Sequence, residues 1–162
     1  MPMTLEQALT AALDDEYQAR ATYRAVLDAH GDVRPFVNIV ESEERHIQAL
    51  RRLCERYEVK IPADPWPSRV SAPESLEAAC EAAVEGERGN GALYERLMEA
   101  ATGRADVEET FRRLSSASRE NHLPAFERAL ARERGRGDVP EPQAGGRRHR
   151  RRHRGGRPAG TA

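Results

Sequence analysis

The sequence predicts an all-α protein, a four-helix bundle with one long crossover, and three observations support that fold class. Apolar residues recur at helical spacing in four long stretches. Hydrophobic residues make up 38% and charged residues 33% of the 162 residues, a composition typical of narrow apolar stripes on strongly solvated helices. The links between the stretches are short, long and short in turn, so the long link falls between the second and third predicted helices.

The first two helices are expected to form a hairpin. Thr4 is a good N-cap for a helix over about residues 4–29, and Gly31 follows its last turn. A second apolar stripe runs to about Tyr57, and Pro35 fits the first turn of its helix. Because so few residues separate the two stripes, the helices should lie side by side.

The second half of the chain repeats this plan after an extended segment. Residues 58–74 contain four prolines, too many for a helix to survive. A third helix is expected over about residues 75–101, with Gly103 after its end, and a fourth over about residues 106–133, with a kink or local rewinding at Pro124. Two hairpins joined by one long connection place equivalent helices across a pseudo-twofold axis, which is the arrangement of a ferritin-like bundle.

The chain divides into one domain and a basic tail. Residues 1–135 are expected to form the ferritin-like four-helix bundle domain, and residues 136–162, rich in glycine, proline and arginine, to be a disordered Arg-rich C-terminal tail. Seven of the 26 basic residues lie at or beyond Arg147, so the formal net charge of −1 conceals an acidic body of −8. Clustered arginines can contact nucleic acid, but no aromatic residue accompanies them, which favours disorder without that partner.

Several functional classes find no support in the sequence. Cys54 and Cys80 stand apart without CxxC spacing, so neither a thiolate zinc site nor a redox pair is indicated. The chain has no run of 18 apolar residues and no signal-like N-terminus, so we expect a cytoplasmic protein without membrane contact. No glycine-rich phosphate loop or serine nucleophile elbow is present either.

A Glu-x6-Tyr motif occurs twice. Glu16 precedes Tyr23 by seven residues on the first predicted helix, and Glu87 precedes Tyr94 by seven on the third. A spacing of seven returns to nearly the same helix face after two turns. The two hydroxyls could therefore hydrogen-bond a glutamate across the bundle and orient it, while packing as ordinary core tyrosines is the alternative.

The other two predicted helices carry an ExxH motif and an altered copy of it. Glu43 and His46 lie side by side on the second helix because they are three residues apart. His122 takes the corresponding position on the fourth helix, but Arg119 stands where the glutamate would be. A guanidinium cannot ligate a metal and keeps its charge. If Arg119 points inward, it takes the place of one cation.

Together these residues predict a carboxylate-rich metal centre. In di-iron bundles, two helices each contribute a glutamate and the other two each contribute an ExxH pair. Carboxylate oxygens and imidazoles suit iron, the favoured metal here, or manganese. Five of the six expected positions are filled, which indicates either two metals or a centre reduced to one. The predicted ligands are Glu16, Glu43, His46, Glu87 and His122.

Three runs of sequence resemble the ferritin-like domain-of-unknown-function family 2202: DDEYxAxATY at residues 14–23, VRPFxNI followed by SEExH at residues 33–46, and ASxxNHLPAF at residues 117–126. The likeness extends over about residues 4–133. This family is distantly similar to rubrerythrins, so the resemblance implies iron-dependent oxidation or peroxide chemistry, with Glu16 and Glu87 as terminal carboxylates. Rubrerythrins also carry a four-cysteine iron site that this chain lacks, so turnover would require an external reductant.

Two functions remain open from the sequence. The first is a metal-dependent oxidoreductase of the ferroxidase or peroxidase type, which oxidises Fe(II) or reduces peroxide. The second is a non-catalytic ferritin-like structural module, in which Arg119 replaces a metal by pairing with Glu43, Glu87 or Glu16. Bundles of this kind often pair through helix faces, so a homodimer is an open arrangement for either function.

Overall fold

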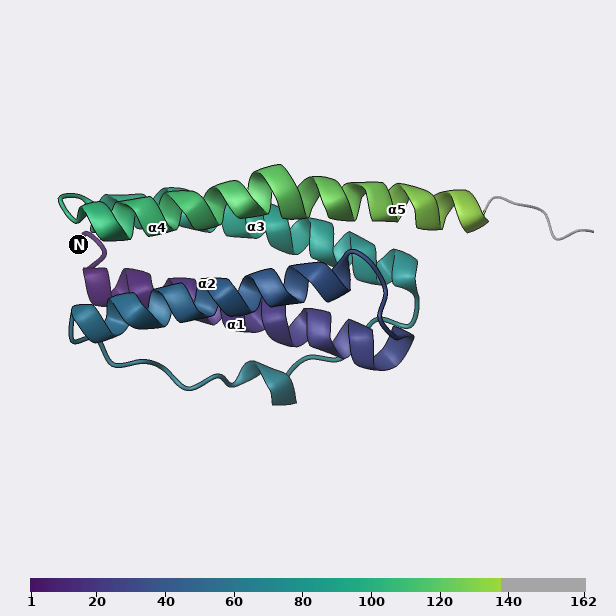
Figure 1. The fold of residues 1–162 in the computed structure, drawn as a ribbon, viewed down its shortest axis with the longest axis horizontal. Coiled ribbons are helices and arrows are strands. Elements are labelled where there is room, and N and C mark those ends of the chain that lie inside the picture. Colours follow the sequence, from purple (N-terminus) through teal and green to yellow (C-terminus); the bar gives the residue numbers. More distant parts are fainter. Residues whose placement is uncertain (138–162) are drawn as a thin grey trace, which may run out of the picture.

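The protein is built from helices, as expected. The computed structural model describes residues 1–137, and all regular secondary structure in that range is helical. The described residues form four long helical segments, the last of which changes its winding in the middle. The segments are α1 (Leu5–His30), α2 (Phe36–Arg56), α3 (Leu76–Ala101), and the fourth, made of α4 (Ala105–Ser116), the π-helix η2 (Ala117–His122) and α5 (Leu123–Gly137). Figure 1 shows that this last segment is continuous from α4 to α5.

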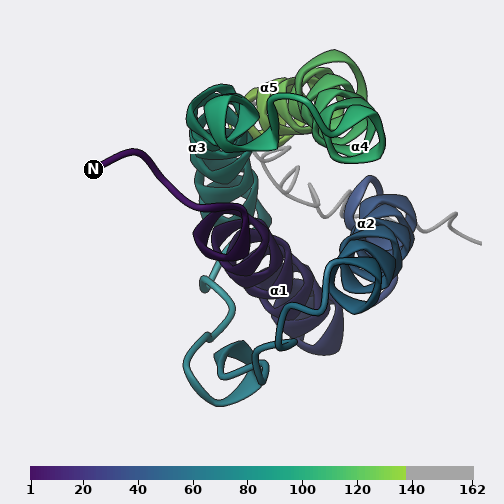
Figure 2. The same ribbon diagram turned by 90° about the vertical axis from the view of Figure 1, so that its left-hand side faces the viewer.

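The helices pack as two hairpins. Residues 31–35 join α1 to α2, and residues 102–104 join α3 to α4. The predicted long connection is present, because residues 57–75 run back along the first hairpin before α3 begins, so that α2 and α3 point the same way (Figure 1). Seen from the end in Figure 2, α1 lies beside both α2 and α3, and the fourth segment lies beside α3.

Local signals in the sequence account for the helix ends. The Thr4 hydroxyl accepts a hydrogen bond from the Gln7 backbone N–H at 3.2 Å, and the Gln7 side chain accepts one from Thr4 N–H at 2.9 Å, completing the predicted capping box. Gly31 ends α1 with φ of 81°, a conformation that favours glycine. Predicted and observed ends of the first three helices agree to within one residue.

The last helix extends further than predicted. α5 ends at Gly137 rather than near residue 133, and Arg134 near its end pairs with Glu81 of α3 at 2.8 Å. Residues 136 and 137, which the sequence analysis placed in the tail, thus belong to α5, and the rest of the predicted tail, residues 138–162, lies outside the described residues. No helix within residues 1–137 combines the length and apolar character needed to cross a membrane.

The crossover is fixed to the outside of the first hairpin. It contains the short 3-10 helix η1 (Trp66–Ser68), whose Trp66 indole N–H donates to Asp14 on α1 at 2.9 Å. Arg20 of α1 donates to Asp64 of the crossover at 2.8 Å and to Glu44 of α2 at 2.5 Å. These contacts tie α1, α2 and the crossover together away from the bundle interior.

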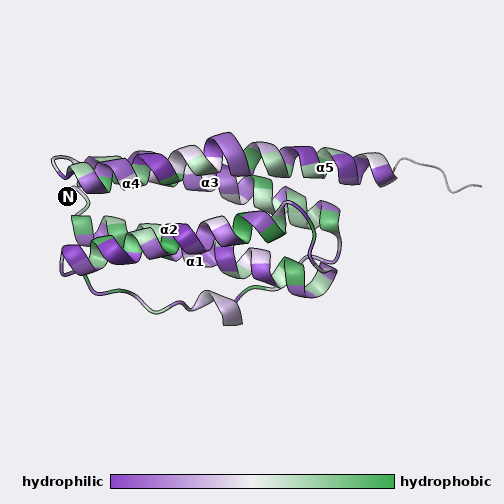
Figure 3. Ribbon diagram, in the orientation of Figure 1, coloured by the Kyte–Doolittle hydropathy of each residue, from purple (hydrophilic) through white to green (hydrophobic). Residues whose placement is uncertain are grey.

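A buried polar layer divides the apolar core. One apolar cluster, including Leu9 and Phe111, fills the end of the bundle where α1 and α4 begin, and a second cluster around Phe126 fills the other end. Figure 3 shows hydrophobic and hydrophilic residues interleaved along each helix. Burying charge without partners is costly, so the layer between the clusters indicates a functional site. Its members are Glu16, Glu43, Glu87, Asn90, Ser118 and His122.

Candidate metal centre

Four of the five predicted ligands belong to this polar layer, and the fifth, the half-buried His46, lies against it. α1, α2, α3 and η2 each contribute to it, and the three carboxylates are no more than 3% exposed. The side chains form two groups of potential donor atoms, and within each group the atoms lie within 4.8 Å of one another. Glu43 belongs to both groups. The first group is Glu16, Glu43 and His46, and the second is Glu43, Glu87 and His122.

The two oxygens of Glu43 face different halves of the centre. His46 Nδ1 lies 3.0 Å from Glu43 Oε2 and 3.2 Å from Glu16 Oε2. His122 Nδ1 lies 3.2 Å from Glu43 Oε1 and 3.5 Å from Glu87 Oε2. The two imidazole rings are stacked, with centroids 5.6 Å apart. Glu43 is therefore placed to bridge two positions, each with one further carboxylate and one imidazole.

The charges in this layer depend on one another. Burial, reinforced by the neighbouring Glu43 charge, raises the pKa of Glu16 to about 7. Burial alone would lower the pKa of each histidine, but the carboxylates beside each ring outweigh it and raise the pKa of His46 to about 9 and that of His122 to about 10. Burial opposes the ionisation of Glu43, yet the adjacent imidazoles of His122 and His46 hold its pKa below the ordinary value. Without a cation, both imidazoles are thus protonated at neutral pH.

The repeated tyrosines cross the bundle. Tyr23 on α1 donates to Glu87 Oε1 on α3 at 2.6 Å, and Tyr94 on α3 donates to Glu16 Oε1 on α1 at 2.7 Å. Burial and the nearby carboxylates raise the pKa of both phenols, so each hydroxyl keeps its proton and remains a donor. Each terminal glutamate has one oxygen held by a tyrosine, while the other faces a histidine.

Sequence reasoning missed two serines that contact the centre. The Ser42 hydroxyl lies 3.3 Å from His46 Nε2 and 3.1 Å from His122 Nε2, behind both rings. Ser118 donates to Glu87 Oε2 at 2.5 Å. A signal for them exists, because each serine precedes a histidine by four residues and so shares its helix face. The S-x3-H repeat is as regular as the Glu-x6-Tyr repeat.

Arg119 does not point into the centre, so it does not take the place of a cation there, as it would if it pointed inward. Its side chain is 50% exposed and pairs with Glu95 on α3. The guanidinium lies over Gly91, where an added Cβ would come within 3.1 Å of Arg119 Nε. The wider π-turn of η2, just before Pro124, rotates Ser118 inward and residue 119 outward. Pro124 lacks the N–H that a regular helix would use there, which accounts for the rewinding.

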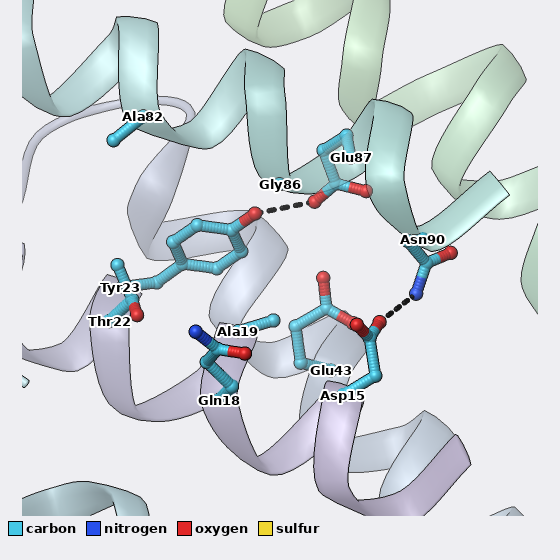
Figure 4. A pocket seen from close by; sticks show the side chains of 10 residues that line it. All are labelled: Asp15, Gln18, Ala19, Thr22, Tyr23, Glu43, Ala82, Gly86, Glu87 and Asn90. Atoms are coloured by element: carbon cyan, nitrogen blue, oxygen red, sulfur yellow. Dashed lines mark hydrogen bonds between the residues drawn. The ribbon is translucent and has the colours of Figure 1, made fainter. Parts of the chain in front are cut away.

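A pocket of about 260 Å³ leads from the surface to this layer between α1 and α3. Glu43, Glu87 and Tyr23 lie at its buried end, and the partly exposed Asp15 lies nearer the surface. Figure 4 shows Asn90 reaching Asp15, a hydrogen bond of 2.6 Å, and Tyr23 reaching Glu87. Burial raises the pKa of Asp15 to about 6, although the Asn90 hydrogen bond opposes that rise.

The donor set fits a pair of hard divalent cations. His122 Nδ1 is buried and has no hydrogen-bond partner, although oxygens of Glu43 and Glu87 lie 3.2 Å and 3.5 Å from it. A cation between these atoms would give that nitrogen a partner. Each half offers two carboxylates and one imidazole, a set that suits iron or manganese and leaves coordination positions open.

Comparisons with known proteins agree with the fold and with the first two of the three sequence runs. The crystal structure of hypothetical protein MJ0754 from Methanococcus jannaschii is similar with a TM-score of 0.70 and 24% identity, over 79% of this chain and 80% of that chain, which shows a shared fold. The comparison with curated proteins gives no match. The family described as an uncharacterized protein domain, DUF2202, matches residues 6–69, and this match confirms the family resemblance for α1, α2 and most of the crossover.

Proposed function

We propose that this chain is a ferritin-like protein that binds two iron or manganese ions and uses them to oxidise Fe(II) or to reduce peroxide. The observation that carries the proposal is the pair of three-residue groups that share one buried carboxylate, Glu43. Each terminal carboxylate, Glu16 and Glu87, would complete one half together with a histidine, His46 and His122 respectively.

The ferritin-like assignment is supported by symmetry as well as by helix order. Two hairpins joined by a long crossover are the arrangement expected of such bundles. The crossed pairs Tyr23–Glu87 and Tyr94–Glu16 are related as a pseudo-twofold axis would relate them. The fold shared with the Methanococcus jannaschii protein supports the architecture but not an activity.

The residues of the chain would position the metals and control access to them. Bound iron or manganese would supply the electron transfer and Lewis acidity that these side chains lack. Tyr94 and Tyr23 fix the terminal carboxylates, and Ser42 orients both imidazoles from behind. Cys54 and Cys80, the two cysteines of the chain, are both buried, so electrons for repeated turnover would come from an external reductant.

The structural-module alternative depended on ion pairs between Arg119 and the buried glutamates of the centre. Arg119 pairs with Glu95 at the surface and makes no ion pair with Glu16, Glu43 or Glu87 within the described part of the chain. In the metal-free protein, the protonated imidazoles of the centre balance the carboxylates instead.

Metal content tests the proposal directly. Protein produced with ample iron or manganese should contain about two ions per chain by elemental analysis, one for each half of the centre. Glu43→Gln should lose both ions, because it removes the carboxylate that the halves share. Glu41→Gln is the matched control, since it makes the same change on the exposed face of α2. Wild-type protein without metal, or full occupancy in Glu43→Gln, would contradict the proposal.

The proposed chemistry requires a separate assay. Loaded protein should accelerate Fe(II) oxidation by dioxygen, or peroxide consumption when an external reductant is supplied. Glu43→Gln should show neither activity, and Glu41→Gln should match the wild type. A loaded wild type that is inactive in both assays would refute the redox function while leaving metal binding intact.

A further inference from the structure

We propose that the pocket between α1 and α3 is the route by which divalent cations reach the centre, and that it delivers them to the half formed by Glu43, Glu87 and His122. This inference rests on the proposed metal-binding function and adds the path that the ions take and the preference of that path for cations. Three features of the pocket carry it: the chemistry of its walls, its size, and the half of the centre at which it ends.

The walls have the chemistry that hard cations prefer. Three of the ten lining residues are carboxylates, Asp15, Glu43 and Glu87, and none of the ten is basic. Gln18 and Thr22 add neutral oxygen atoms. Oxygen donors are the usual ligands of hard divalent cations. A cleft lined by charge of one sign also raises the local concentration of the opposite ion, so this pocket attracts cations and repels anions.

The pocket is large enough for a hydrated ion. Its volume of about 260 Å³ is many times the roughly 10–15 Å³ that a single water needs. An octahedral cation with about six waters therefore fits, and it can exchange waters for carboxylate oxygens as it moves inward. The pocket stays open because several lining side chains are too small to fill it. These are Ala19 on α1 and Ala82 and Gly86 on α3 (Figure 4). A Cβ added at Gly86 would meet no atom within 4 Å.

The sequence repeats would make the two halves of the centre equivalent, but the pocket reaches only the half that contains Glu87. Glu87 and Tyr23 line it, but their counterparts Glu16 and Tyr94 do not. The half that it reaches also contains His122, whose buried Nδ1 has no hydrogen-bond partner. An arriving cation therefore meets the carboxylates of Glu43 and Glu87 at the end of the pocket, whereas Glu16 does not line it.

Two glycines of α3 provide a matched experiment. Gly86→Leu places a side chain in the pocket, whereas Gly89→Leu makes the same change at an exposed position where an added Cβ also meets no atom within 4 Å. Metal-free protein is mixed with Co²⁺ in a stopped-flow instrument, and the absorbance of bound Co²⁺ gives the loading rate. Elemental analysis gives the final content. Gly86→Leu should load roughly tenfold or more slowly than wild type, as expected when a steering cleft is lost, and should reach the same final content. Gly89→Leu should load at the wild-type rate.

The outcomes separate the route from the binding site. If Gly86→Leu loads at the wild-type rate, the route is wrong and metal binding stands. If the wild type takes up no Co²⁺ at equilibrium, metal binding fails and the route falls with it. Should Gly86→Leu not fold, Thr22→Leu fills the same pocket from α1 and carries the same expectation. If Gly89→Leu slowed Co²⁺ loading equally, the effect would come from any large substitution on α3 and not from the pocket, and the proposal would be overturned.

Discussion

Cation binding at this centre should release protons, so its affinity should rise steeply with pH. The pKa of His46 is about 9 and that of His122 about 10 in the metal-free protein, because both imidazoles lie against buried carboxylates. Each Nδ1 faces the carboxylates and must lose its proton before it can bind a metal. Loading of both halves at pH 7 therefore releases about two protons, and Glu16, with a pKa of about 7, adds about half of one.

The size of the effect follows from these pKa values. One pKa unit corresponds to about 1.4 kcal/mol, so deprotonation at pH 7 costs roughly 3 kcal/mol at His46 and roughly 4 kcal/mol at His122. Each rise of one pH unit between 7 and 9 lowers the deprotonation cost of each histidine by about 1.4 kcal/mol. Affinity for each of the two cations should therefore rise by about tenfold per pH unit in that range.

Stability of the metal-free protein should change in the opposite direction. A histidine whose pKa is raised by folding stabilises the native state fully below its unfolded pKa of about 6.5. That contribution is lost as pH rises through about 9 for His46 and about 10 for His122. The raised pKa of Glu16 acts in the same sense at lower pH, between about 4.5 and 7. Metal-free protein should thus unfold at a lower temperature at pH 10 than at pH 6.5, while bound metal should stabilise the protein more as pH rises.

Calorimetric titration with Mn²⁺ measures the proton release. The titration is repeated at pH 7 in buffers of different ionisation enthalpy, and the dependence of the observed heat on that enthalpy gives the number of protons. Thermal unfolding of metal-free protein at pH 6.5 and pH 10 checks the second trend. An affinity that is flat between pH 7 and 8, with proton release near zero, would refute the assignment of protonated imidazoles to the metal-free centre.

Two further predictions concern single side chains. Tyr94→Phe removes the 2.7 Å hydrogen bond to Glu16 Oε1 and should lower the free energy of unfolding of the metal-free protein by about 1–3 kcal/mol, measured in a urea titration; an unchanged midpoint would show that the hydroxyl contributes nothing. Arg119→Gln should leave metal content unchanged by elemental analysis, because that side chain pairs with Glu95 outside the centre. A gain or loss of metal in this variant would show that Arg119 enters the site in solution.

The parts of the structure that the sequence predicts are those with local causes. Thr4 and Gly31 mark the ends of α1 because a cap and a positive φ depend on a few neighbouring residues. The buried glutamates Glu16 and Glu87 were identifiable as candidate ligands because each interrupts an apolar stripe at the same depth in the bundle. On a helix, the spacing between two residues in the sequence determines whether they lie on the same face.

Features that depend on several helices could not be predicted in the same way. Ser42 reaches His122 across 80 residues of sequence, and neither residue alone indicates that contact. Pro124 indicated that the fourth helix rewinds, but the length of the π-turn, which decides the orientation of Arg119, depends on packing against α3. The pocket likewise exists only because small residues from two helices meet.

The π-turn also explains how the protein accommodates a missing ligand. A fourth carboxylate beside Glu43 and Glu87 would add negative charge to a layer in which two imidazolium groups already face three carboxylates, and buried unpaired charge is costly. η2 instead presents Ser118, a neutral donor that satisfies an oxygen of Glu87 at 2.5 Å. The metal-free layer is therefore closer to neutral than a symmetric six-ligand centre would be. The residue missing from a symmetric centre is the counterpart of Glu43, which faces both halves, so in the proposed centre each half would have one protein ligand fewer. The same turn of helix would then account both for the charge balance of the metal-free layer and for an open coordination position in the proposed centre.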